Sequence, residues 1–466
     1  MARVVPICLH GDEGRGKRRS QTTVVSWECV LGMVAAPTRC SQCKPTSLPE
    51  DNGVGWGGNP LARDLVCNLK GHSFIQHFPL FVLPGTIWKA YKTITHKMLQ
   101  RVASDFHDLF YHGVEVDGNT WYAAAIGSKG DLKWWSKICH LKRGYENKGK
   151  KSDIPHCHAC LAGSAGLPAE DLGSSPCWVS TIYKVRPWDV ENPPDLDMVP
   201  YDTEMPEAFY KHDSFHTLRL GIYRDFCGSV VFMLLHMGYF GPGDIDAKLT
   251  AAHNHFHLWQ LATHKHAALR SFTKHLLCYK NAKSFPWFNC KGSDCALLVM
   301  WIHTLVCGIL VGGVPRDHQR PLEVIRDTAA VATDFYGIVV KHNMFLTRDC
   351  GSSLVEKGRS FINGYSILAQ LSFTFQWCLF AIKPKAHFFR HIVYELESQL
   401  ARQNQLLLNP LLFDCSQNED FIGRVCRMAR KIDHRVMGVR VLTNYLIKAG
   451  LLYDRAVQNK KQRLAA

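Results

Sequence analysis

Three acidic residues stand at positions from which a sheet and a helix could bring them to one site. Asp12 follows the apolar run VVPICLHG, Asp131 ends the apolar segment WYAAAIGSKG, and Glu419 lies in the polar segment SQNEDFIG. Clustered carboxylates repel one another unless a hard cation neutralises them, and oxygen-rich sites suit Mg²⁺ or Mn²⁺. Two such ions about 4 Å apart activate a water or a 3′-hydroxyl in phosphodiester transfer. The alternative is that each Asp merely caps a turn or a helix.

A second group of chemically active residues lies between Cys139 and Cys160, in CHLKRGYENKGKKSDIPHCHAC. Cys157 and Cys160 have the spacing at which two thiolates bind one Zn²⁺, and Cys139 or His140 could complete a tetrahedral site. The alternative is reduced, partly buried thiols beside surface histidines. A further CxxC pair, in the segment RCSQC at residues 39–43, has no second pair nearby.

Basic side chains form two clusters near the predicted acidic site. The first consists of Lys17, Arg18 and Arg19, and the second of Arg424, Arg427, Lys431 and Arg435. Such clusters neutralise phosphates without reading base sequence. The second follows helical three- and four-residue steps, so we expect it on the helix that carries Glu419. The alternatives are a solvated helix face and a nuclear import signal.

The elements that must position these residues follow from hydrophobic periodicity and turn signals. We expect a strand hairpin over 4–32, a loop over 36–63, a third strand near Phe81, a helix over 93–111 and a strand ending at Asp131. Residues 186–210 contain five Pro and predict an extended linker, and residues 211–405 are helical nearly throughout. A final helix is expected from Ser416 to about Gly450.

Composition sets the class of protein. The chain has 466 residues, of which 46% are hydrophobic and 20% charged, so a globular protein with one large or two smaller cores is expected. Its net charge of +15 favours an anionic partner, most often nucleic acid. The 18 Cys are scattered and the start has no secretory pattern, which favours reduced thiols in the nucleus or cytoplasm. Residues 295–314 are uncharged; a core helix is favoured there over a membrane span.

The order of these motifs resembles the catalytic region of eukaryotic DNA transposases that have a ribonuclease-H-like fold and a DDE triad. In that group a Cys/His zinc motif follows the second Asp, as HCHAC follows Asp131 here. A D-x-x-H segment then opens a helical insertion, similar to Asp213–His216 in this chain. Near its end comes K-P-K-x-H-x-x-x-H, seen here from Lys383 to His391, before the helix that bears the Glu.

The resemblance implies a mixed α/β fold with a ribonuclease-H-like sheet interrupted by a helical insertion. Its parts would be residues 1–135 of the core, a zinc-motif region over 136–185, the linker over 186–210, the insertion over 211–405 and a helix over 406–466 that completes the core. Two alternatives concern the triad. Asp213 could replace Asp131, and Asp420, which directly follows Glu419, could take the third position. Such transposases usually carry a DNA-end-binding domain before the first strand, and here that strand begins at residue 4.

The sequence therefore predicts a transposase-like nuclease or strand transferase, active or degenerate, that uses Mg²⁺ or Mn²⁺ and contains Zn²⁺. Its expected partner is DNA, with self-association as a further expectation and a membrane as an unlikely partner. A non-catalytic nucleic-acid-binding relic is the main alternative, and a single-span membrane protein is the other. The relic and the enzyme differ in whether the three carboxylates converge.

Overall fold

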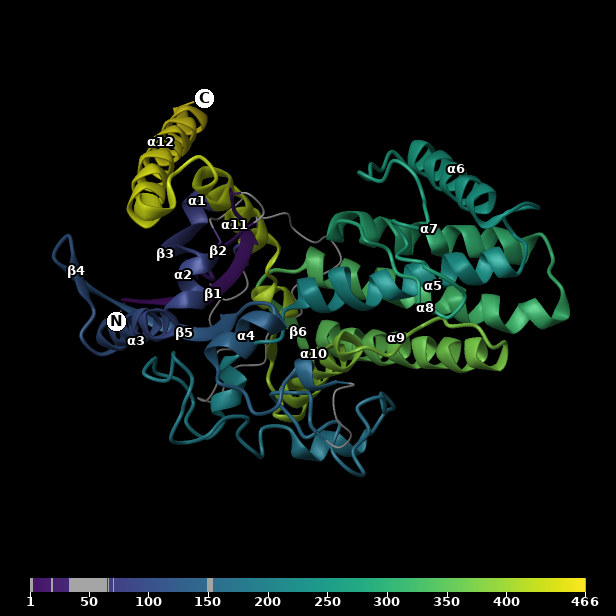
Figure 1. Cartoon of the computed structure of the whole chain (residues 1–466), viewed down its shortest axis with the longest axis horizontal. Helices are drawn as coiled ribbons and strands as arrows, with labels where there is room; N and C mark the ends of the chain where they lie inside the picture. Colours follow the sequence, from purple (N-terminus) through teal and green to yellow (C-terminus); the bar gives the residue numbers. More distant parts are fainter. Residues whose placement is uncertain are drawn as a thin grey trace.

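The computed structural model describes residues 3–17, 20–32, 65, 67–69, 71–148 and 154–465. The predictions for Arg18, Arg19, the loop over 36–63 and the RCSQC pair lie outside these residues. The described chain is a mixed α/β structure, as the sequence predicts, with a five-stranded sheet at one end and a helical bundle at the other (Figure 1).

The sheet is mixed and has the strand order β3-β2-β1-β5-β4. Its strands are β1 (Arg3–Arg15), β2 (Gln21–Cys29), β3 (His77–Pro84), β4 (Val114–Val116) and β5 (Asn119–Lys129). The first three form an antiparallel meander, β5 pairs parallel with β1, and β4 pairs antiparallel with β5. The hairpin over 4–32 and the strand near Phe81 are thus confirmed.

Helices cover both faces of this sheet (Figure 1). Alternation along the strands sends Val25 to one face and Val24 to the other, so each face has its own apolar cluster. The first face packs against α2 (Gly85–Ala90), α3 (Lys92–Tyr111) and α4 (Leu132–Ile138). The second packs against α1 (Ser73–Gln76), α11 (Ser416–Ala429) and α12 (Met437–Ala465). The sheet is therefore the middle layer of three.

The final helix of the chain is two helices rather than the one that the sequence predicts. Between α11 and α12 the side chain of Asp433 accepts a hydrogen bond from the backbone N of Arg435, which caps a short 3-10 turn over His434–Val436. The reversal lets apolar residues of both helices, including Val425 and Val441, pack in the same cluster on the sheet. A continuous helix would have carried its second half away from that face.

Between α4 and the bundle the chain has few regular elements, in agreement with a Cys/His region followed by an extended Pro-rich segment. The bundle then begins with a π-helical turn over Phe215–Ile222. Its helices are α5 (Tyr223–His236), α6 (Ile245–Thr263), α7 (Gly292–Val311), α8 (Arg316–Lys341), α9 (Arg348–Thr374) and α10 (Pro384–Ala401). They share one large apolar core, and β6 (Phe345–Thr347) pairs with β7 (Leu406–Leu408) beside it.

The uncharged segment over 295–314 forms most of α7. Among the described residues, α7 is the one helix long and apolar enough to cross a membrane. Its side chains Trp301, Ile302 and Val306 are buried in the bundle core, where α7 packs between α5 and α8. One face of α7 thus packs in the bundle core, and 44% of its apolar window is buried.

Candidate active site and metal centre

Three carboxylates that are far apart in sequence act electrostatically on one another where β1, α4 and α11 adjoin, but their oxygens do not all lie within 4.8 Å of one another. Asp12 lies in β1, Asp131 is the N-cap of α4, and Glu419 lies in the first turn of α11. Burial raises the pKa of Asp12 well above its ordinary value, and the charges of Glu419 and Asp131, with a hydrogen bond to Glu419, raise it further. The side chains form one electrostatic cluster in which a proton or a cation must offset the repulsion.

Two glycines beside Asp12 let the neighbouring helices approach β1 closely. A Cβ atom at Gly11 would lie 2.1 Å from the ring of Trp134 in α4. One at Gly14 would lie 2.4 Å from Sγ of Cys426 in α11. Because neither distance leaves room for a side chain, glycine at these positions is what lets α4 and α11 bring their carboxylates to Asp12.

Asp131 also has a local structural role. Its Oδ1 accepts a hydrogen bond of 2.7 Å from the backbone N of Trp134, and this interaction caps α4. The capping alternative is therefore correct for this residue, but it does not exclude the other role, because the same carboxylate acts on the pKa of Asp12. The cap fixes the carboxylate in place at the end of β5.

Asp213, which could replace Asp131 in the triad, is linked to Glu419 through His216. Its Oδ2 lies 2.5 Å from Nδ1 of His216, whose Nε2 lies 3.4 Å from Oε1 of Glu419. Burial disfavours the imidazolium, but Asp213 and then Glu419 raise the pKa of His216 to about 9. Burial also opposes ionisation of Asp213, but His216 and backbone N–H donors lower its pKa to about 2. At neutral pH an ionised Asp213 and a charged His216 thus support Glu419.

The start of α11 is held by the segment that contains Asp213. Oδ1 of Asp213 accepts a hydrogen bond of 3.0 Å from the backbone N of Cys415. Arg219 donates to both oxygens of Asp414, at 3.0 and 2.8 Å, and Ser214 donates to one of them at 3.2 Å. These contacts set the position of the helix turn in which Glu419 lies.

A buried ionic network lies beneath the carboxylates. Glu28 of β2 forms ion pairs with Lys129 of β5 and His77 of β3, and it accepts a hydrogen bond of 3.0 Å from Asn418 of α11. Burial opposes its ionisation, but Lys129 and His77 lower the pKa of Glu28 to about 2. Since Lys129 lies two residues before Asp131 and Asn418 directly precedes Glu419, the network ties two of the three carboxylates to the sheet.

Asp420, the other candidate for the third carboxylate, has partners of its own. Its Oδ2 accepts hydrogen bonds from Oγ of Ser73 at 2.8 Å and from Nε of Arg424 at 2.6 Å. These partners lie on α1 and on the next turn of α11. Burial opposes ionisation of Asp420, but the hydrogen bonds from Arg424 and Ser73 lower its pKa. Geometry therefore favours Glu419 over Asp420 as the member of the cluster.

A cavity of about 280 Å³ opens beside the carboxylates. Its walls include Asp131, Asp213 and His216, together with Lys385 at the start of α10. Nζ of Lys385 donates to the backbone O of Leu220 at 2.8 Å, and burial lowers the pKa of this lysine. Acidic and basic groups thus line the same cavity, which includes one of the three clustered carboxylates, Asp131.

Cys157 and Cys160 meet two histidines of α10 in a buried tetrad. Sγ of Cys157 lies 3.4 Å from Nε2 of His391, and Sγ of Cys160 lies 3.3 Å from Nε2 of His387. The two Nε2 atoms are 3.1 Å apart, and all four ligand atoms lie within 4.8 Å of one another. Two sulfurs and two imidazole nitrogens in this arrangement can hold a metal such as Zn²⁺.

The surroundings favour the ligating forms of Cys157 and His387, whereas burial and the neighbouring Cys157 raise the pKa of the Cys160 thiol well above its ordinary value. Burial opposes ionisation of Cys157, but Cys160 and His391 lower the pKa of its thiol well below the ordinary value. Burial lowers the pKa of His387 to about 4, so its imidazole is neutral near pH 7. Backbone N–H groups of Ala159 and Ala162 point at the two sulfurs, at 3.3 and 3.4 Å. Thiolate and neutral imidazole are the forms that bind Zn²⁺.

The prediction that Cys139 or His140 completes the zinc site requires correction. Cys139 is the C-cap of α4 and is buried in the cluster under the sheet, whereas Cys157 and Cys160 belong to a different cluster. His140 lies in a separate group with His96 and Asp195. Residues at i and i+4 share one face of a helix. The HxxxH spacing of His387 and His391 in α10 is therefore the sequence signal for the two histidines that lie beside Cys157 and Cys160.

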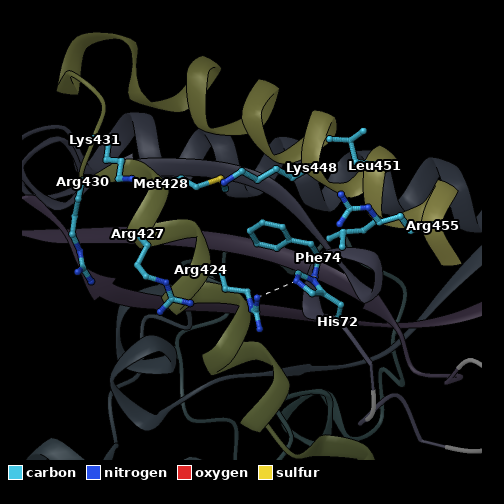
Figure 2. Close-up of a pocket in the computed structure, with 11 residues that line it drawn as sticks. His72, Phe74, Arg424, Arg427, Met428, Arg430, Lys431, Lys448, Leu451 and Arg455 are labelled. Carbon is cyan, nitrogen blue, oxygen red and sulfur yellow. Dashed lines mark hydrogen bonds between the residues drawn. The ribbon is translucent and has the colours of Figure 1, made fainter.

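A basic groove of about 620 Å³ lies between α11 and α12 (Figure 2). Its apolar floor includes Phe74 and Met428, and Nη1 of Arg424 is 3.0 Å from Nε2 of His72. The cations that line it are Arg424, Arg427, Arg430, Lys431, Lys448 and Arg455. Three of the four residues predicted from the second basic cluster are therefore in this groove.

Arg435 is the exception in that cluster. It lies in the 3-10 turn after α11 rather than on the helix, and its Nε pairs with Oδ1 of Asp433 at 3.1 Å. Hydrogen bonds from Arg435 lower the pKa of the same Asp433, and Lys17, from the first cluster, adds a smaller electrostatic contribution. The helix break that the sequence did not predict is the physical reason for the displacement of Arg435.

Neither the scan against protein-family models nor the search of curated proteins gave a match for this chain.

Proposed function

We propose that the chain is a transposase-like DNA nuclease or strand transferase that depends on a divalent metal ion, with DNA as its partner and the nucleus as its location. One observation carries this proposal: Asp12 is buried, and the charges of Glu419 and Asp131 add to the effect of burial in raising the pKa of its carboxyl well above its ordinary value. Neighbouring carboxylates repel one another when all are ionised. Because a hard cation offsets this repulsion, they form a fitting ligand set for Mg²⁺ or Mn²⁺.

The residues of the site would have separate roles. Asp12, Asp131 and Glu419 would hold the ions, which supply activation of the attacking oxygen and stabilisation of the leaving oxygen. His216 keeps Glu419 oriented through the 3.4 Å contact with its carboxylate. Lys385, on the wall of the adjoining cavity, can neutralise a phosphate oxygen.

The Cys/His tetrad is a second feature that supports the proposed active site. Lys385 opens α10, and His387 and His391 follow it on the same helix. A Zn²⁺ ion held by these histidines and by Cys157 and Cys160 would fix the start of α10, and with it one wall of the cavity. A structural role for this ion follows from its four protein ligands, which leave no open position for substrate.

The topology is compatible with a ribonuclease-H-like core. An antiparallel meander followed by a strand parallel to β1 is the arrangement expected of that fold, and the helices α5–α10 fall between Asp131 and Glu419 in sequence. These features support an origin among transposases with a helical insertion. The six cations of the basic groove on α11 and α12 support this groove as the DNA contact nearest the site.

A nicking assay on supercoiled DNA tests the proposal with paired variants. Wild-type protein should nick with Mg²⁺ or Mn²⁺ and not with EDTA. Asp131→Asn and Glu419→Gln should each lower the nicking rate by more than about 100-fold, the upper range for residues that only support a metal ligand. Asp420→Asn is the matched control for Glu419→Gln, because Asp420 is its neighbour but pairs with Ser73 and Arg424.

Equal rates for wild type and Glu419→Gln would contradict the assignment. The basic groove keeps the non-catalytic relic as the second candidate, since the groove does not need the carboxylates. Metal-independent DNA binding by the wild type, with nicking absent under every metal condition, would establish the relic instead. Binding by Glu419→Gln without nicking is the outcome expected of the enzyme.

A further inference from the structure

A third group of metal-binding residues lies apart from both the carboxylates and the Cys/His tetrad. His96 comes from the first turns of α3, His140 directly follows the C-cap of α4, and Asp195 belongs to the Pro-rich segment over 186–210. Nδ1 of His96 is 2.6 Å from Oδ2 of Asp195, and Nε2 of His140 is 3.6 Å from Oδ1. All three ligand atoms lie within 4.8 Å of one another.

A hydrogen-bonded His–Asp pair does not account for this arrangement. The Asp195 side chain is 0% exposed, and its Oδ1 has no hydrogen-bond partner. The 3.6 Å between Oδ1 and His140 is too long for a hydrogen bond. It is close to the separation of about 3.4 Å between neighbouring ligands on a tetrahedral ion with bonds of about 2.0–2.1 Å.

The backbone holds the three residues in this arrangement. The N–H of Asp195 donates to the O of Ile138 at 2.9 Å, which fixes the carboxylate against the end of α4. His140 has a φ of 49°, in the left-handed region that costs a non-glycine residue free energy. Such a conformation persists only where the surroundings enforce it, and here it accompanies the placement of an imidazole beside a buried carboxylate.

We propose that His96, His140 and Asp195 bind one divalent transition-metal ion of the Zn²⁺ type. Two imidazoles and one carboxylate are the borderline donors that Zn²⁺, Co²⁺ and Ni²⁺ accept, whereas Mg²⁺ prefers oxygen alone. The side chains of His96 and His140 are 30% and 19% exposed, so an ion can enter from solvent and keep a water as its fourth ligand.

The ion would brace the Pro-rich segment. It would join α3, the end of α4 and residue 195 at one point, and the same segment leads on to Tyr210 and to Asp213. Tyr210 is buried against the cluster under the sheet, and its neighbour Lys211 donates its backbone N–H to the O of Ser128 in β5. This role does not depend on the nuclease proposal, because none of the three residues belongs to the carboxylate cluster.

Metal content of the purified full-length chain provides the test. After loading with Zn²⁺ in excess Mg²⁺, which would occupy the oxygen ligands of the carboxylate cluster, and removal of free metal, the wild type should hold two Zn²⁺ ions per chain. His140→Ala and Asp195→Asn should each hold one, and Cys160→Ser should hold one at the other site. His107→Ala is the matched control: it removes a histidine from the same helix α3, whose ring contacts Asp108 and Tyr111, and it should keep both ions.

Cobalt spectroscopy separates the two sites in the wild type, so the test does not depend on whether a variant folds. Co²⁺ at the Cys/His tetrad gives a thiolate charge-transfer band, and Co²⁺ at His96, His140 and Asp195 gives only ligand-field bands. Two equivalents, of which one develops no charge-transfer intensity, is the expected titration. Saturation at one equivalent, or two ions retained by His140→Ala and Asp195→Asn, would overturn the proposal.

Discussion

Single side chains in this protein do their work through partners that are distant in sequence. His387 and His391 are the clearest case, because without Cys157 and Cys160 they would be two imidazoles buried in an apolar cluster beside Trp178. Nδ1 of His387 is buried without a hydrogen-bond partner, which leaves the ring held by packing and by its contact with Cys160. An ion bound by Nε2 would supply the interaction that keeps these four groups together.

Loss of that ion should lower the stability of the fold. A ligand present at about 1,000 times its Kd stabilises the native state by about 4 kcal/mol, and a chelator or Cys160→Ser removes this term. Thermal unfolding of the zinc-loaded protein should therefore shift to lower temperature in Cys160→Ser. Cys177→Ser is the matched control, since Cys177 is exposed and lies outside the tetrad. Equal melting temperatures for the two variants would contradict a structural metal.

Local pattern explains which site residues the sequence could predict. Cys157 and Cys160 could be predicted because their spacing is itself the signal, and Asp131 and Glu419 because one caps a helix and the other lies in a first turn. Asp12 lies inside β1, which runs on to Arg15 rather than ending at the carboxylate. The partners His387 and His391 were not assigned as ligands, since they lie more than two hundred positions from the cysteines they contact. Glu28 and Lys129 carry no local signal either; only the pairing of β1 with both β2 and β5 brings them together.

At the scale of elements, α11 is the piece that connects the sheet, the bundle and the groove. Its first turn carries Glu419, and Asn418 before it bonds the buried Glu28. Its later turns carry Arg424 and Arg427 into the groove. The sequence predicted this amphipathic helix and its polar start, but not its end. That end depends on Asp433 and on the shared apolar cluster with α12, which periodicity alone does not contain.

The ion pairs of Glu28 should make stability depend on pH at the acidic end. The pKa of Glu28 falls from an ordinary 4.5 to about 2 on folding, so its contribution is complete above about pH 4.5 and is lost as pH falls through about 2. A shift of this size corresponds to about 3 kcal/mol. The free energy of unfolding in urea, measured between pH 6 and pH 2.5, should therefore decline for the wild type.

Glu28→Gln should lose this decline. At pH 6 the variant should be less stable by about 3–5 kcal/mol, because Lys129 is left buried without its partner. Its difference from the wild type should then shrink as pH falls. Glu115→Gln on β4 is the control, since Glu115 is exposed and contacts Thr120 on the surface. A constant difference across the pH range would contradict the ionic role of Glu28.

At the scale of the whole molecule, part of the positive charge is gathered in the groove between α11 and α12. The chain carries 55 basic against 40 acidic residues, and six of the basic side chains line the groove between α11 and α12 (Figure 2). Glu419 and Arg427 are eight residues apart on one helix, so the groove begins within about 12 Å of the carboxylates. A phosphate backbone bound in the groove would continue toward the candidate active site.

The salt dependence of DNA binding tests whether the groove, rather than the net charge, makes this contact. Each neutralised phosphate of duplex DNA contributes about 0.9 to the slope of log K against log salt concentration. Arg427→Ala combined with Arg455→Ala should weaken binding and reduce the slope by about 1.8. Arg316→Ala combined with Arg320→Ala, on the exposed start of α8, removes the same charge far from the groove and should leave the slope unchanged. Equal slopes for the two double variants would show that the charge acts through the molecule as a whole, and the groove would lose its assignment.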